Sequence, residues 1–114
     1  MVREPSKVLR QITAPAPVPS STQVLLKVHS VALNPVGYKA MMYFPSFTVK
    51  KPCIPESDVS GVIVTVGKDV KEWKVGDQVF GVTSVRDNFK TGQGALAQYT
   101  VVRQEFLYVS FGIN

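Results

Sequence analysis

The sequence predicts a mainly β fold, a small and partly open β-barrel with one or two short helices that is incomplete at its C-terminus. Three observations support this prediction. The apolar runs are short and rich in β-branched residues, which favours strands over helices. Eight glycines and eight prolines interrupt the chain at short intervals. No segment keeps a helical period over three turns, and many short strands at close spacing are typical of a barrel or a sandwich.

The first two strands are predicted on either side of a proline-rich stretch. Residues 8–12 form the first strand, and the prolines after it keep the chain extended because each fixes φ and lacks an N–H. The second strand covers residues 23–31. Its alternation places Leu26 and Val28 on one face and Lys27 on the other.

The middle of the chain contains the expected helix and the strongest strand. One or two helical turns are expected over residues 36–43, and Pro45 ends them. Residues 59–66 form the strongest strand. Gly61 inside it indicates a β-bulge or a close contact with a neighbouring backbone.

The last third alternates strands with a turn and a polar loop. Gly76 and Asp77 form a turn in which the Asp77 carboxylate accepts backbone N–H bonds. The remaining elements are predicted as a strand at 78–82, a polar loop at 87–94, and strands at 97–102 and 106–109.

Composition favours one globular, soluble domain in the cytoplasm. The 114 residues are 45% hydrophobic, which suits one folded domain and argues against disorder. The net charge of +5 is scattered along the chain, so no nucleic-acid partner is expected. The single cysteine, Cys53, excludes an internal disulfide and favours a reducing compartment. No apolar run is long enough to span a membrane, and the N-terminus lacks a signal sequence, so no membrane partner is expected.

Two kinds of site are suggested by single residues or motifs but lack the context they need. Residues 92–97 (GQGALA) match the dinucleotide fingerprint, which requires a strand before it and a helix after it. Here a loop precedes and a strand follows, so we interpret the match as coincidence. Zinc needs several converging nitrogen or sulfur ligands. His29 and Cys53 are the only histidine and cysteine, so no metal site is expected.

Motifs spread along the chain occur in a recognisable order. Residues 24–28 (VLLKV) lead to 32–39 (ALNPVGYK), which is similar to V-L-V-K-V followed by N-P-x-D-x-K. Residues 54–67 (IPESDVSGVIVTVG) resemble P-x-x-G-x-D-x-x-G-x-V-x-x-V-G. Residues 73–81 (WKVGDQVFG) resemble F-K-x-G-D-x-V-x-G, and 94–99 (GALAQY) resemble G-A-F-A-E-Y. The order and spacing resemble the zinc-free medium-chain dehydrogenase/reductase superfamily, in its quinone-oxidoreductase and enoyl-reductase branch.

Positions at which the chain differs from related motifs indicate which branch of that superfamily it resembles. The zinc-dependent alcohol dehydrogenases carry Cys where this chain has Asn34, and His-Glu where it has Ser57 and Asp58, so the resemblance points to the zinc-free branch. Gly37 replaces a common Asp, and Glu56 replaces a common Gly. Both replacements are expected to disturb local turns.

The resemblance implies an NADPH-dependent oxidoreductase that reduces a quinone or an activated, enoyl-type double bond by hydride transfer. It places Asn34 at the nicotinamide pocket and Tyr38 and Phe44 on the substrate side. Tyr43 is expected to donate a proton, since a positioned phenol can serve as an acid near an enolate. The family position falls on Tyr43 or on its neighbour Phe44, and the alternative role of Tyr43 is aromatic packing.

The resemblance also implies a domain organisation. Residues 1–109 correspond to the GroES-like N-terminal domain of alcohol dehydrogenases, and 110–114 form a tail unlike the family. We therefore expect the Rossmann domain that holds NADPH to be absent, the isolated chain to be inactive or nearly so, and an exposed sheet edge to favour homo-oligomers. The alternative is a truncated, non-catalytic binding module of the same fold. A GroES-type chaperonin partner is a third option, which the reductase motifs argue against.

Overall fold

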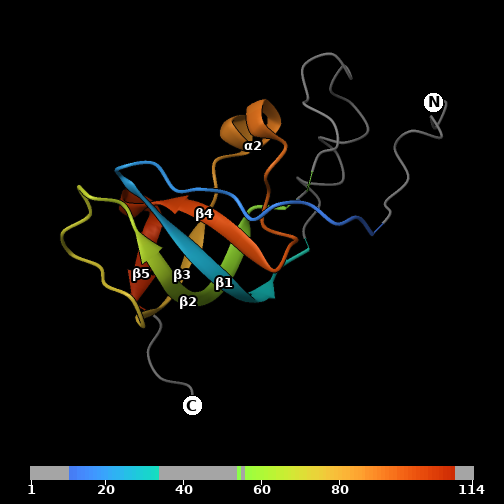
Figure 1. Cartoon of the computed structure of the whole chain (residues 1–114). Coiled ribbons are helices and arrows are strands. Elements are labelled where there is room, and N and C mark those ends of the chain that lie inside the picture. The colour runs from blue at the N-terminus through green and yellow to red at the C-terminus, as the bar shows by residue number, and fades with distance from the viewer. Residues whose placement is uncertain (1–10, 34–53, 55, 110–114) are drawn as a thin grey trace, which may run out of the picture.

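The computed structural model describes residues 11–33, 54 and 56–109, which build a single antiparallel sheet and one short α-helix (Figure 1). In chain order the elements are β1 (Gln23–Val31), β2 (Asp58–Val66), β3 (Gln78–Val82), α2 (Val85–Thr91), β4 (Tyr99–Arg103), the 3₁₀ turn η3 (Gln104–Phe106) and β5 (Leu107–Val109). The sheet has five strands in the order β4-β1-β2-β3-β5.

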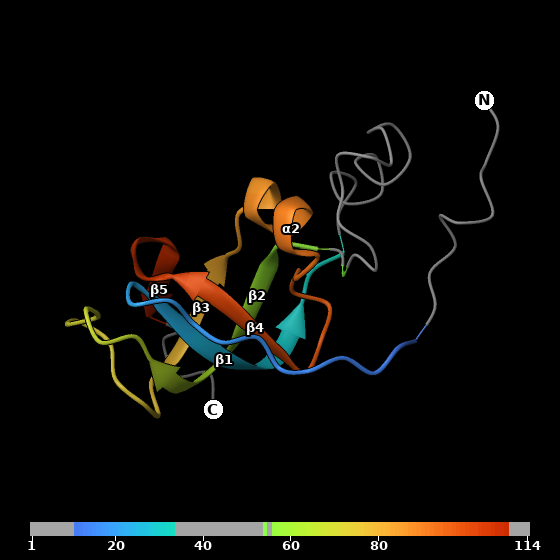
Figure 2. The ribbon, with the colours of Figure 1, turned by 45° about the horizontal axis from the view of Figure 1, so that its top comes forward.

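The strand order forces this sheet to curl. β4 and β5 lie at opposite edges of the sheet, yet only η3 separates them along the chain. Such a connection, of four Cα steps, reaches at most about 14 Å. The edges of a flat five-stranded sheet are about 19 Å apart. The edges therefore approach each other, and a Cβ added at Gly81 of β3 would lie 3.4 Å from the Val102 side chain of β4. This is the partly open barrel that the sequence predicts, visible as the curled ribbon of Figure 2.

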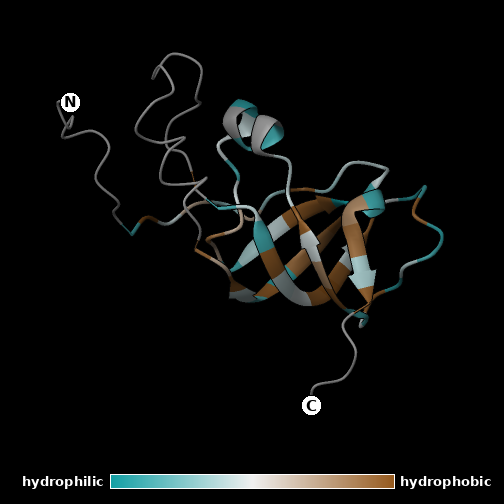
Figure 3. Cartoon of the chain, turned by 180° about the vertical axis from the view of Figure 1, so that it is seen from behind, coloured by the Kyte–Doolittle hydropathy of each residue, from teal (hydrophilic) through white to brown (hydrophobic). Residues whose placement is uncertain are grey.

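The interior of the barrel is filled by aliphatic side chains from every strand. Along β1 the predicted alternation is confirmed, because Leu26 is buried and Val28 is partly buried, whereas Lys27 is exposed. Figure 3 shows apolar positions concentrated on the strands. The buried hydrophobic residues are Val24, Leu26, Val59, Ile63, Val79, Ala95, Val102 and Leu107.

Gly61 lies on β2 where the backbone of β1 comes close. A Cβ at this position would lie 2.3 Å from the carbonyl oxygen of Lys27, well inside any allowed contact. The pairing also shifts register on either side of Gly61, between Leu25 and Leu26 and again after Val28. The predicted close backbone contact is therefore confirmed, and β-bulges flank it.

One predicted loop was wrong. Residues 87–91 of the predicted polar loop at 87–94 belong instead to helix α2 (Val85–Thr91). Ser84 caps its N-terminus by accepting the N–H of Asp87 at 3.2 Å, and Gly92 ends it in the left-handed conformation at φ 74°. The helix forms because both of its ends carry the residues that satisfy unpaired helix-end groups.

The other predicted elements differ from the structure mainly at their ends. Strands 23–31 and 78–82 are confirmed, and so is the Gly76 turn, where Asp77 Oδ2 accepts the N–H of Lys74 at 3.0 Å. The strand predicted at 97–102 is shifted to 99–103, and the strand predicted at 106–109 begins at Leu107 because Phe106 belongs to η3. Residues 11 and 12 have no regular structure. The rest of the 8–12 strand and the 36–43 helix lie outside the described residues.

The outer face of β3 and β5 carries exposed aromatic rings. Phe80 and Tyr108 pair across the two strands and stack, with ring centroids 5.4 Å apart. Both side chains are about half exposed, at 48% and 55%. Self-association through such a surface stays a prediction.

Candidate functional site

The residues predicted to contact cofactor or substrate follow β1 in the sequence. These four, Asn34, Tyr38, Tyr43 and Phe44, fall outside the described residues, and their roles stay predictions. The structure does describe the end of β1 and the start of β2, the two strands between which these residues fall in the sequence; we call this pair of strand ends the frame. Because β1 and β2 are antiparallel, the start of β2 lies beside the end of β1, where Val31 pairs with Val59. One step further, the N–H of Ala32 donates to the carbonyl of Asp58 at 3.1 Å, so Leu33 leaves the sheet next to the start of β2.

The short segment that enters β2, residues 54 and 56–58, is held by the loop after α2. We call it the connector. The N–H of Ile54 donates to the carbonyl of Gly92 at 2.8 Å. The N–H of Ala95 donates to the carbonyl of Glu56 at 2.9 Å. The connector is therefore bonded through its backbone to the loop after α2, and it lies between the sheet and α2 (Figures 1 and 2).

A buried polar cluster joins the connector to β3 and α2. The N–H of Thr83 donates to the carbonyl of Ser57 at 2.8 Å. The Thr83 hydroxyl lies 2.7 Å from the side-chain amide of Asn88, and both residues are buried. In the orientation that satisfies both ends of this amide, its Oδ1 accepts from Thr83 and its Nδ2 donates to the carbonyls of Gln93 (3.0 Å) and Ser84 (3.1 Å). One side chain thus fixes both ends of α2.

Glu56 stands in the connector with a backbone conformation that glycine adopts most easily. Its φ is 75°, in the left-handed region that costs a residue with a Cβ about 1–2 kcal/mol. Glycine is common at this position of the motif. The sequence predicts that Glu56 disturbs the turn. In the structure the turn keeps the backbone geometry that glycine would adopt, and Glu56 is buried.

The loop that matches the dinucleotide fingerprint has the wrong structural context. Gly92 ends α2, and β4 follows the loop, so the order is helix then strand. The hydroxyl of buried Thr100 donates to the carbonyl of Gly94 at 3.1 Å and ties the loop to β4. A pyrophosphate site needs the opposite order. The residues of this loop therefore do not fit the phosphates of a nicotinamide cofactor, as the sequence predicts.

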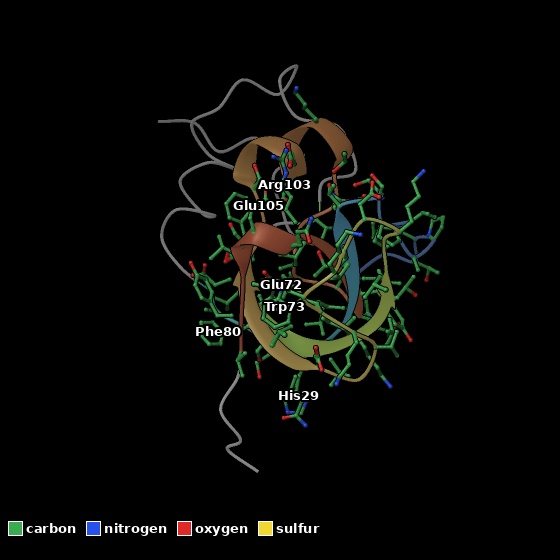
Figure 4. The ribbon with its side chains drawn as sticks, turned by 90° about the vertical axis from the view of Figure 1, so that its left-hand side faces the viewer. His29, Glu72, Trp73, Phe80, Arg103 and Glu105 are labelled. Atoms are coloured by element: carbon green, nitrogen blue, oxygen red, sulfur yellow. The ribbon has the colours of Figure 1, made fainter. Side chains whose placement is uncertain are left out.

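Among the described residues, His29 belongs to no group of side chains that could hold a metal ion. It lies on β1 with its side chain exposed, away from the other labelled residues of Figure 4. Within residues 11–33, 54 and 56–109, no three histidine, cysteine, aspartate or glutamate side chains gather as metal ligands would. In the same part of the chain, no helix is long and apolar enough to cross a membrane.

A second polar feature lies at the opposite end of β1, and sequence reasoning missed it. It is an open hollow of about 460 Å³ beside the β2–β3 loop. Figure 4 looks onto this end of the barrel. The residues that line the hollow come from three separate stretches of sequence. No local sequence motif could therefore have predicted it. The lining residues are Thr22, Glu72, Trp73, Gln104 and Glu105.

Comparison with known proteins gives one family and several similar relatives. Residues 20–110 match the family model described as the alcohol dehydrogenase GroES-like domain. The chain is 39% identical over 99 residues to a chloroplast envelope quinone oxidoreductase homolog of Arabidopsis thaliana, covering 85% of this chain and 29% of that protein. It is 41% identical over 87 residues to a chloroplastic NADPH-dependent alkenal/one oxidoreductase of the same plant, covering 75% of this chain and 22% of the relative.

The solved structures agree with this match. The quinone oxidoreductase from Coxiella burnetii superposes with a TM-score of 0.75 at 28% identity, covering 93% of this chain and 33% of that one. The chain thus spans about a third or less of the length of the proteins it matches.

Proposed function

Because this chain belongs to the alcohol dehydrogenase GroES-like domain family of the medium-chain dehydrogenase/reductase superfamily, we propose that it is the substrate-side domain of an NADPH-dependent oxidoreductase. The reaction is reduction of a quinone or of an enoyl-type double bond by hydride transfer. Similar relatives are named for quinones and for alkenals, which share a double bond conjugated to a carbonyl group. Some of these relatives are named as chloroplastic, so a cytoplasmic location stays a prediction.

The observation that carries the proposal is the frame at the end of β1. The backbone bonds from Ala32 to Asp58 and from Thr83 to Ser57 fix the position at which the chain leaves β1 and returns to β2. The intervening residues include Asn34 and Tyr43. A substrate pocket needs such a rigid base, because the acid must be held in place while charge develops on the substrate.

The proposed roles follow the resemblance. Asn34 lies against the nicotinamide, and Tyr38 and Phe44 contact the substrate. When a hydride reaches the β-carbon of an enal, an enolate forms, and the Tyr43 hydroxyl donates the proton that completes the saturated product. A quinone reduced in this way becomes a hydroquinone anion, a weaker base, so it depends less on Tyr43.

NADPH supplies the hydride in this proposal. The loop at residues 92–97 does not fit the cofactor phosphates, and the phosphate site is assigned to other parts of the enzyme. The name of one similar relative, an NADPH-dependent alkenal/one oxidoreductase, supports NADPH as the hydride donor.

The native size of the protein tests the proposal first. Intact mass of the protein isolated from its source with antibodies against residues 56–109 should exceed 12.5 kDa several-fold if the chain is part of a reductase. A native product near 12.5 kDa that neither binds nor oxidises NADPH would instead support the non-catalytic binding module.

Kinetics of the native-length enzyme then test the residue roles. With NADPH and trans-2-hexenal, Tyr43→Phe should lower kcat by roughly 10²-fold, the usual contribution of a positioned acid. Reduction of 1,4-benzoquinone should change far less. Phe44→Leu is the control, and it should mainly raise KM. Unchanged enal turnover in Tyr43→Phe would reduce Tyr43 to a packing residue.

A further inference from the structure

The hollow and the predicted reaction site lie at opposite ends of one strand. Thr22 immediately precedes β1 and lines the hollow. Asn34 follows the other end of this nine-residue strand. The hollow is therefore separate from the substrate side proposed above, and what it binds is an independent question.

Trp73 supplies the aromatic wall of the hollow. It is the only tryptophan in the protein. Its side chain is half-buried and packs against the hydrophobic core while also lining the hollow. Core packing on one side fixes the ring, so little conformational freedom remains to be lost when a ligand meets the other side.

Two carboxylates, Glu72 and Glu105, line the same hollow. Both are exposed, and neither forms an ion pair with another described residue. The nearest cation in sequence to Glu105 is Arg103, which is already engaged, because its Nε donates to Asp87 Oδ2 at 2.8 Å. Figure 4 shows Glu72 and Trp73 with Glu105 and Arg103 at this end of the barrel.

Two lysines adjoin Glu72 and Trp73 in the sequence. Lys71 and Lys74 have exposed side chains, and neither is among the lining residues. The protein as a whole carries a net charge of +5, so a general attraction of cations is not expected. Any preference of the hollow for a cation must therefore come from its own lining.

We propose that the hollow binds an organic cation, a guanidinium or alkylammonium group. The face of an indole ring attracts such cations, more strongly than the other aromatic rings do. The two carboxylates complement the charge, and the polar side chains of Thr22 and Gln104 remain free to accept N–H bonds from it. An anion would be repelled, and a neutral apolar ligand would remove the carboxylates from water without compensation. The cation comes either from a small molecule or from an arginine or lysine side chain of another polypeptide.

Fluorescence of Trp73 tests the proposal directly on the 114-residue chain. Titration with ethylguanidinium chloride, at constant ionic strength, should give a saturable change with a dissociation constant of about 5–200 mM, the range of one cation–π contact with two exposed ion pairs. Ethylurea is the matched control because it has nearly the same shape without the charge. It should produce no saturable change.

Charge-neutralising variants locate the binding. Glu72→Gln and Glu105→Gln should each weaken ethylguanidinium binding by roughly 2–5-fold, the value of an exposed ion pair. Asp69→Asn is the control, because Asp69 lies in the β2–β3 loop with Glu72 but does not line the hollow. The affinity of this variant for ethylguanidinium should stay unchanged. Matching thermal unfolding curves show that each variant is folded.

Two outcomes overturn the proposal: ethylurea that binds as well as ethylguanidinium, or Glu72→Gln and Glu105→Gln variants with unchanged affinity. Absence of any saturable signal, checked by amide shifts in NMR spectra, also overturns it. A capped Gly-Arg-Gly peptide separates the sources. Affinity at least tenfold above that of ethylguanidinium assigns the site to a polypeptide side chain, and equal or lower affinity assigns it to a free cation.

Discussion

The two ends of β1 are built in opposite ways. At the connector end, backbone groups and the buried amide of Asn88 hold one another at 2.7–3.1 Å, and Glu56 is kept in a strained conformation. At the hollow end, Glu72 and Glu105 extend into solvent without an ion-pair partner in the described part of the chain. The comparison suggests a division of roles. One end fixes the course of the chain, and the other offers side chains to a ligand, so substitutions should cost stability at the first end only.

The largest effect is expected at Asn88. Replacement by Ala removes the amide that joins α2 to Thr83, so the buried Thr83 hydroxyl and the carbonyl of Gln93 lose the bonds they form with it. The free energy of unfolding should fall by about 2–3 kcal/mol. Urea titration followed by circular dichroism measures it. Gln98→Ala, at an exposed amide, should change it by less than about 0.5 kcal/mol. Equal losses of unfolding free energy in Asn88→Ala and Gln98→Ala would contradict the special role of the connector end in stability.

Backbone strain at Glu56 gives the next effect. Glu56→Gly and Glu56→Ala both remove the same side-chain interactions, but only glycine adopts φ 75° without strain. The Gly variant should be more stable than the Ala variant by about 1 kcal/mol in the same titration. At an ordinary position glycine would be the less stable of the two, so the sign of the difference is decisive.

The ion pair between Arg103 and Asp87 links the two ends. It joins the last residue of β4 to α2, with Nη2 2.6 Å from Oδ2, but both side chains are partly exposed to solvent. A double-mutant cycle with Arg103→Gln and Asp87→Asn should give a coupling energy of about 0.2–1 kcal/mol. The coupling should fade in about 1 M NaCl, where the Debye length falls to about 3 Å. A coupling energy that stays the same in about 1 M NaCl would mean that the ion pair is shielded from solvent, contrary to the exposure of its two side chains.

The smallest effect belongs to the hollow. Glu72→Gln and Glu105→Gln should leave the free energy of unfolding within about 0.5 kcal/mol of the original, because exposed charges without partners contribute little. The same two variants should lose affinity for ethylguanidinium. A marked loss of stability in either would show that the carboxylate supports the fold, and the contrast between the two ends would disappear.

The strands could be predicted because their pattern is local. The alternation of Leu26 with Lys27, and the glycine and aspartate of the Gly76 turn, carry their structure within a few residues. Helix α2 was missed although Ser84, Asp87 and Gly92 carry its two caps. It has only seven residues, and its two apolar residues, Val85 and Phe89, are too few for the repeated apolar spacing that identifies most helices.

Long-range features could not be predicted in this way. The hollow depends on the curl of the sheet, which brings Thr22, Trp73 and Gln104 together from distant parts of the sequence. The left-handed conformation of Glu56 contradicts local preference and follows from the bonds that hold the connector. The predicted reaction residues, from Asn34 to Phe44, remain predictions.

The strand order has a consequence for how the chain is made. Among the strands in the described part of the chain, β1 is synthesised first, but it lies inside the sheet between β4 and β2. Its Leu26 pairs with Thr100 on β4. At a synthesis rate of about 5–20 residues per second, that partner appears roughly 4–15 s later. During this interval β1 can pair with β2 but not with β4, so the oldest of the described strands gains its second neighbour only after most of the barrel has been synthesised.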